Sequence, residues 1–132
     1  MIHKLFDNLK QLFTFRPASV TATANGTAVD TQGYMDGAVV LEVGAVTGTA
    51  PTLDVKMQES DTSGGTYTDI TGAVFTQVVA SNSSQIIRLA ELNVGRKRFI
   101  RAVATIAGTG PNFTFGCEVL LGNSFAGAIN ND

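Results

Sequence analysis

The stretch Thr52-Leu53-Asp54-Val55-Lys56-Met57-Gln58 alternates without a break between polar and apolar side chains. Successive side chains of an extended strand point to opposite faces of its sheet, so the stretch predicts a strand with one buried and one wet face. Leu53, Val55 and Met57 are expected to face the core. A strand that is wet on one side is typical of an antiparallel sheet.

The same two-residue period recurs on both sides of this stretch. Inward faces are predicted for Val39, Leu41 and Val43, for Ile100, Ala102, Ala104 and Ile106, and for Phe113, Phe115, Cys117, Val119 and Leu121. Glycine-containing turns separate these runs, and we place the clearest at Gly48-Thr49-Ala50-Pro51, Ser63-Gly64-Gly65 and Gly108-Thr109-Gly110-Pro111. The first and last are expected to end strands, and the middle one to close a hairpin.

Short strands with turns every 8 to 12 residues are typical of a sandwich or barrel. Strands are predicted near residues 18–24, 27–32, 38–46, 52–60, 66–70, 73–79, 84–91, 97–107 and 113–121. The predicted fold class is all-β: an antiparallel β-sandwich, jelly-roll-like, of about eight or nine short strands with an N-terminal amphipathic helical arm.

The arm is predicted from a different period at the start of the chain. Its apolar residues recur at helical spacing, namely Ile2, Leu5, Phe6, Leu9, Leu12 and Phe13. Arg16-Pro17 ends the pattern, because the residue before a proline is pushed out of the helical region. A helix this short is marginal alone in water, so its apolar stripe must dock on something. These six residues are the predicted partner-binding site, and the alternatives are docking on the arm's own domain or on a membrane surface.

This pattern divides the chain into three parts. We predict an amphipathic arm over residues 1–17, a β-sandwich domain over 18–122 and a flexible tail over 123–132, which is rich in Gly, Ala and Asn. The broken apolar run after Lys4 predicts no export signal.

The composition argues against several classes of function. The chain has 132 residues, of which 15% are charged, and its net charge is −2. Nucleic-acid-binding domains are usually basic, so we expect no nucleic-acid partner. No apolar run is long enough for a membrane-spanning helix, and the arm carries few cations, so we expect no membrane partner. The single cysteine, Cys117, is compatible with folding in a reducing cytoplasm.

The residues available for catalysis are few. The one histidine, His3, lies in the arm, and Cys117 falls on the apolar face of its strand, where a core role is favoured. We therefore expect no catalytic residues, no metal and no cofactor, and predict that the protein is not an enzyme. Four acids near one hairpin, Asp54, Glu59, Asp61 and Asp69, are interpreted as a polar strand face and a turn. The basic cluster Arg96, Lys97, Arg98 and Arg101 is interpreted as a solvated edge or as salt-bridge partners.

Several segments together resemble a group of small tailed-bacteriophage virion proteins encoded among head genes. The resemblance spans roughly residues 30 to 122 and rests on the order of Gly33–Val46, Val55–Asp61, Tyr67–Ala73, Val94–Thr105 and Phe115–Gly122. Related proteins commonly have Trp where Tyr67 stands, and the arm is not part of the shared pattern.

The resemblance implies a structural role. It implies a decoration or cement protein on the capsid exterior, made in the host cytoplasm, that binds the major capsid protein lattice as a homo-oligomer, with a trimer favoured. The alternatives are a head-tail connector or tail component, and a displayed carbohydrate- or receptor-binding β-sandwich. The absence of Trp weakens the sugar-binding alternative, because an exposed aromatic cluster would support it.

Overall fold

The computed structural model describes residues 9–92 and 94–124. The described residues form strands and no helix: β1 (Lys10–Val20), β2 (Ala24–Asn25), β3 (Val29–Asp30), β4 (Tyr34–Ser60), β5 (Thr68–Val74), β6 (Ser83–Leu89) and β7 (Phe99–Ser124). All pairs of these strands are antiparallel. The prediction of an all-β antiparallel fold is confirmed.

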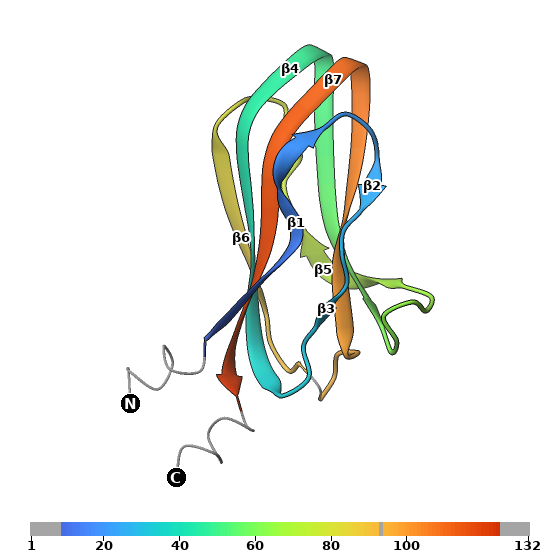
Figure 1. Ribbon diagram of the computed structural model, residues 1–132, viewed down its shortest axis with the longest axis vertical. Coiled ribbons are helices and arrows are strands. Elements are labelled where there is room, and N and C mark those ends of the chain that lie inside the picture. The colour runs from blue at the N-terminus through green and yellow to red at the C-terminus, as the bar shows by residue number, and fades with distance from the viewer. Residues whose placement is uncertain (1–8, 93, 125–132) are drawn as a thin grey trace.

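Two long strands, β4 and β7, organise the molecule. They pair along their whole length, from Tyr34 opposite Ser124 to Ser60 opposite Phe99. Figure 1 shows that both strands rise together, bend over at the top and descend again. One continuous sheet is thus folded on itself into a sandwich-like body.

The folded sheet has two layers. The first contains β1, the C-terminal half of β7, the N-terminal half of β4, and β6. The second contains β2 and β3, the N-terminal half of β7, the C-terminal half of β4, and β5. In the first layer, β1 and β6 are therefore the two edges.

The prediction that residues 48–51 and 108–111 end strands is wrong, because both β4 and β7 continue through them. They form corners within β4 and β7, and they face each other, with Thr49 opposite Thr109. Gly48 and Gly108 have φ values of 116° and 119°, which favour glycine. A Cβ at Gly48 would lie 2.7 Å from the Gly110 carbonyl oxygen, and one at Gly108 would lie 2.8 Å from that of Ala50.

The two corners are copies of one pattern. The sequence of residues 43–55 resembles that of residues 103–115, with glycine, threonine and proline at matching places in each corner. The pairing repeats as well: Val46 lies opposite Phe113 as Leu53 lies opposite Ile106. The corner therefore has a local two-fold symmetry, in which each strand bends because the other does.

The core lies between the layers and contains the predicted inward residues. Leu53, Val55 and Met57 are at most 1% exposed, and the inward faces of β4 and β7 predicted from alternation are likewise buried, apart from the half-buried Ile106. The predicted hairpin is also confirmed, since Glu59 lies opposite Thr68 on either side of residues 63–65. The predicted bounds of the next two strands, 66–70 and 73–79, agree less well with the structure. β5 spans Thr68–Val74, and the residues between it and β6 form no regular strand.

The predicted helix is wrong for residues 10–16, which belong to strand β1. β1 pairs with the end of β7, from Lys10 opposite Leu121 to Val20 opposite Phe113. The physical reason is that pairing with the edge of β7 joins these residues to an existing sheet and its core, whereas an isolated helix of this length is marginal in water. Pro17 lies where the register shifts, between Phe15 and Ala18, a bulge in which a missing N–H is tolerated. The boundary placed after residue 17 thus falls inside a strand.

Thr14 joins β1 to the second layer. Its buried Oγ1 accepts a hydrogen bond of 3.0 Å from the Ala102 backbone N–H, and its carbonyl accepts one of 2.7 Å from the Thr27 N–H. Ala102 lies on β7 where β2 has ended and β3 has not begun. Neither β2 nor β3 pairs with β7 at Ala102. The Thr14 side chain, from the first layer, therefore supplies the acceptor for the Ala102 N–H.

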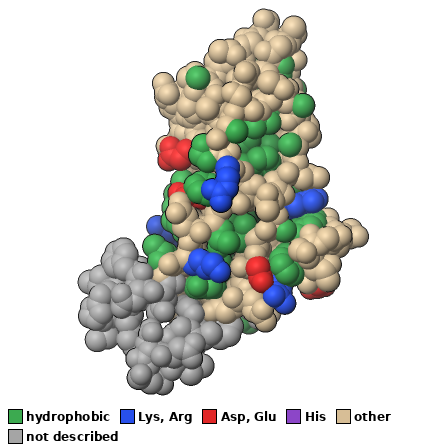
Figure 2. Space-filling view, viewed as in Figure 1, with side chains coloured by type: hydrophobic (Ala, Val, Ile, Leu, Met, Phe, Trp, Pro, Cys, Tyr) green, Lys and Arg blue, Asp and Glu red, His purple; other side chains and the backbone are tan. Residues whose placement is uncertain are grey.

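Charge is distributed unevenly along the long axis. Residues 17–29, 43–53, 70–87 and 102–117 contain no Asp, Glu, Lys or Arg. Figure 2 shows the charged side chains of one face over its middle and lower parts, and none at the top, where the corner lies. The corner end therefore presents small uncharged side chains.

Within the described residues, no helix is long and apolar enough to cross a membrane.

Candidate partner-binding surface

An apolar hollow of about 450 Å³ lies on the outside of the first layer, where the described chain begins. The residues that line it are Leu9, Asp36, Gly37, Ala38, Arg88, Leu89, Ala90, Leu120 and Gly122. Strand register brings most of them together, because Ala38 of β4 lies opposite both Leu120 of β7 and Arg88 of β6. The neighbours Val39 and Val119 are buried, so Ala38 and Leu120 face outward.

The apolar surface continues beyond the hollow. Val40 follows Ala38 on the same face and lies opposite Ile86 of β6. Leu9 is 45% and Ile86 57% exposed, so this face keeps large apolar side chains in water. Contiguous exposed apolar surface is a mark of contact with another molecule.

Polar groups border the apolar floor. Asp36 and Arg88 both line the hollow, and the Asn123 side-chain amide donates a hydrogen bond of 3.1 Å to Asp36. Nearby on the same layer, the Gln11 amide donates to the Glu118 carboxylate. An apolar centre with a polar rim is the usual anatomy of a protein–protein contact.

The structure disperses the predicted partner-binding stripe. Ile2, Leu5 and Phe6 lie outside the described residues, and Leu9 lines the hollow. Leu12 packs against the core from one face of β1, whereas Phe13 is half-buried with the Arg16 guanidinium 5.2 Å from its ring centre. In a strand, adjacent side chains such as these two cannot share a face. The role of the stripe in binding stays a prediction.

Sequence reasoning missed the β4 and β7 parts of this surface. A signal was present, because Ala38-Val39-Val40-Leu41 and Val119-Leu120-Leu121 are apolar at every position. Unbroken apolar runs are typical of strands covered on both faces. Here the outer face lacks a cover within the described part of the chain, which is why it is a candidate for binding.

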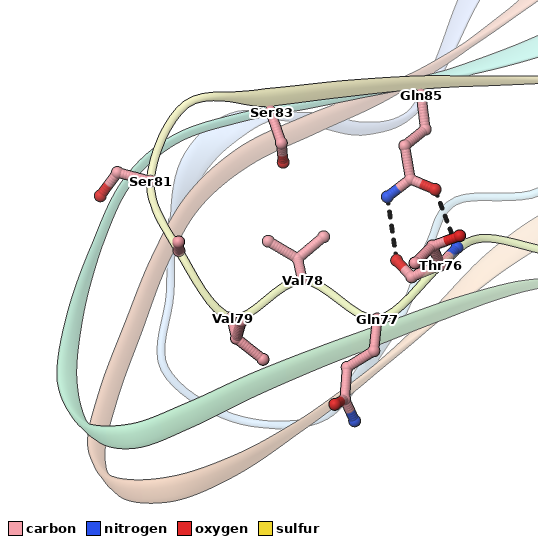
Figure 3. A pocket seen from close by; sticks show the side chains of 8 residues that line it. Thr76, Gln77, Val78, Val79, Ser81, Ser83 and Gln85 are labelled. Carbon is pink, nitrogen blue, oxygen red and sulfur yellow. Dashed lines mark hydrogen bonds between the residues drawn. The ribbon is translucent and has the colours of Figure 1, made fainter.

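A second hollow, of about 380 Å³, lies between β6 and the segment 76–81 (Figure 3). The Gln85 side chain crosses it, accepting a hydrogen bond of 2.8 Å from the Thr76 N–H and donating one of 2.9 Å to the Thr76 carbonyl. Val78 and Ser83 point into the space, and the buried Ser83 Oγ has no partner among the described residues. The amide pair ties β6 to the second layer from the inside of the sandwich.

Cys117 belongs to the core, as predicted. Its side chain is fully buried, and burial, with a smaller contribution from Glu118, raises the pKa of the thiol to about 12. The thiol therefore stays protonated at neutral pH, and a protonated thiol is a poor nucleophile.

The acidic and basic side chains near the hairpin neutralise one another. Lys56 lies 3.0 Å from Asp69, Arg96 3.8 Å from Glu59 and Lys97 3.9 Å from Asp61. The hydrogen bonds from Gln58 and Lys56 lower the pKa of Asp69. The structure shows no group of three or more metal-ligating side chains in its described part. The ion pairs of Asp69, Glu59 and Asp61 agree with the interpretation of these acids as a polar strand face and a turn.

The basic cluster is likewise engaged within the chain. The Arg98 guanidinium contacts both oxygens of Asp30, at 2.9 and 2.8 Å, and lowers the pKa of that carboxyl. Arg101 donates to the Gln58 amide oxygen and lies 4.0 Å from the centre of the Tyr67 ring. The interpretation of the cluster as salt-bridge partners holds for Arg96, Lys97 and Arg98.

Comparison with known proteins informs the fold and not the function. No protein-family model and no curated protein matches the sequence. Over 86% of its length the chain is similar to 31% of a chain in the structure of infectious bursal disease virus Gx strain, with a TM-score of 0.54 and 10% identity. This likeness shows a shared fold.

Two further structures are more distant. The SPBc2 prophage-derived protein YomS has a TM-score of 0.49 and 12% identity, over 86% of this chain and 92% of that one. A protein of the Bacillus endospore appendages, described as disulfide-linked pili, has a TM-score of 0.45 and 19% identity, over 87% and 88%. At these scores neither likeness carries an argument about this chain.

Proposed function

We propose that this protein is a non-enzymatic virion structural protein that decorates a phage capsid. It binds the lattice of major capsid protein on the capsid exterior, with the apolar hollow beside Leu9 as its contact. The observation that carries the proposal is the hollow itself, with Leu9 at its rim. The stripe Ile2, Leu5 and Phe6 leads directly to that residue in the sequence.

Two further observations support the proposal, and two physical arguments are compatible with it. The sequence resembles phage head proteins over most of the sandwich. A likeness of fold to a chain in a virus structure is compatible with this class. The contact can also be weak at each site, because many identical copies on one particle add up to firm attachment. A protein that binds the assembled lattice and not its free subunits stabilises that lattice by mass action.

The test is binding to capsids from the phage that encodes the chain, after they are stripped of this protein. We expect the full chain to co-sediment with them, and Leu9→Asp to weaken binding about tenfold, because a carboxylate replaces a side chain whose burial is worth about 1.5–3 kcal/mol. Val74→Asp is the matched control, since Val74 is 61% exposed on the other layer and should not matter. Failure of the full chain to bind, or equal binding by the two variants, would contradict the proposal.

A further inference from the structure

Strand β6 has one edge without a strand partner among the described residues. It pairs with β4 on one side, from Gly37 opposite Leu89 to Val43 opposite Ser83. Figure 1 shows β6 along one side of the molecule with no strand beyond it. An unpaired strand edge is a ready template for pairing with another chain.

Two other sheet edges, those of β1 and β5, are covered or interrupted in ways that β6 is not. Residues 24–30 run beside β1 and bond to Thr14 and Ala102, and β1 carries a bulge with Pro17. β5 is broken by a register shift between Lys56 and Gln58 of its partner β4. By contrast, β6 has seven residues and no proline, and it pairs with β4 without a register shift. Bulges and proline are usual protections of an edge, and β6 has neither.

The contact that β6 makes with the segment before it leaves this edge open. Gln85 bonds to Thr76 through its side chain, which reaches into the sandwich, as Figure 3 shows. The Asn82 N–H bonds to Gly44 on the β4 side. Neither contact uses the outer backbone edge of β6.

We propose that the occupant of this edge is β6 of a second copy of the chain, paired antiparallel about Ile86. Ile86 is the middle residue of β6, so this register pairs the whole strand. A two-fold axis there makes the same patch serve both subunits, which is the commonest form of protein dimer. The first layers of the two copies then form one continuous sheet.

The exposed side chains of β6 fit this register. Ile86, which is 57% exposed, meets its own copy across the axis and buries apolar surface. Arg88 falls opposite Ser84 of the other copy, so the charged residues of the two strands do not face each other. An opposite charge lies on the next strand beyond Ser84. The Ser84 hydroxyl donates a hydrogen bond of 2.7 Å to the carboxylate of Glu42 on β4.

Arg88 therefore faces Glu42 of the other copy across Ser84. The two lie two strand spacings apart, about 9.5 Å, within reach of an extended arginine and glutamate. Within one chain the same residues are four positions apart along neighbouring strands, about 13 Å, and make no ion pair with each other. The pair thus belongs to the dimer, which contains it twice.

The test is sedimentation equilibrium of the full chain over a range of concentrations, without capsids. We expect a dimer of twice 13.8 kDa, and a dissociation constant raised about tenfold or more by Ile86→Lys, which sets two ammonium groups face to face. Val74→Lys, at a strand position with similar exposure on the other layer, should leave it unchanged. Arg88→Glu and Glu42→Arg should each weaken the dimer several-fold, and the double charge swap should restore it.

A monomer throughout the concentration range, a trimer, or a dimer that ignores Ile86→Lys would overturn the inference. Loss of the charge-swap rescue would overturn the register. The experiment contains no capsid, so its failure leaves the proposed lattice binding standing, and failure of lattice binding leaves the dimer standing.

Discussion

Replacing Gly108 with Ala should lower the free energy of unfolding by about 3 kcal/mol, because it combines backbone strain with a clash. The φ of Gly108 is 119°, a conformation that side chains disfavour. Its new Cβ would lie 2.8 Å from the Ala50 carbonyl oxygen and 2.9 Å from the Pro51 Cα. Both are backbone atoms of the facing corner, so neither can rotate out of the way. Urea unfolding followed by circular dichroism measures the change.

The symmetry of the corner sharpens this prediction. Gly48 meets Gly110 and Pro111 as Gly108 meets Ala50 and Pro51, so Gly48→Ala should cost nearly the same. Gly64→Ala is the control, since a Cβ at Gly64 meets nothing within 4 Å, and it should change stability by less than about 0.5 kcal/mol. If either corner variant is as stable as the Gly64 variant, the two strands do not bend together as described.

The variant Thr14→Val should destabilise the protein by about 1–3 kcal/mol, although the two side chains have nearly the same shape. The substitution removes the acceptor of the Ala102 N–H, which then remains buried without a partner. Leaving a buried donor unsatisfied costs its full desolvation penalty. The loss should appear as a lower urea midpoint with an unchanged denaturant slope.

Thr105→Val provides the comparison, because Thr105 is exposed and belongs to the same strand as Ala102. It should leave stability nearly unchanged. The pair of variants also distinguishes β1 from the helical arm predicted from the sequence, since a helix with the stripe inward would place no hydroxyl against Ala102. Equal midpoints for the two variants would count against the strand.

The alternation of side chains was enough to predict the core. A strand with one buried face and one wet face has a sequence that alternates between apolar and polar residues. The prediction that Leu53, Val55 and Cys117 face the core is therefore confirmed. The corners were missed for a different reason. Gly-Thr-Ala-Pro and Gly-Thr-Gly-Pro indicate a break in regular strand geometry, but whether a chain reverses or bends there depends on the facing strand. The likeness of residues 43–55 to 103–115 was the available clue.

The start of the chain shows how tertiary pairing overrides a local pattern. The spacing of Leu9, Leu12 and Phe13 suits a helix, yet residues 10–20 pair with β7. Strand pairing with an existing sheet edge supplies backbone hydrogen bonds and buries Thr14, neither of which is visible in a helical period. The candidate site could not be predicted for a similar reason. Ala38, Arg88 and Leu120 come together only because β6, β4 and β7 are neighbours in the sheet, and a local pattern does not give the order of strands. Among the described residues of the predicted stripe, Leu9 alone lines the hollow.

The proposed capsid decoration is tested most directly by counting copies of the chain per particle, using quantitative mass spectrometry of virions purified from the phage that encodes it. The proposal predicts a copy number comparable to that of the major capsid protein, because a decoration protein repeats across the lattice. A number that matches a single ring at the neck or tail, or the absence of the chain from the particle, would contradict it.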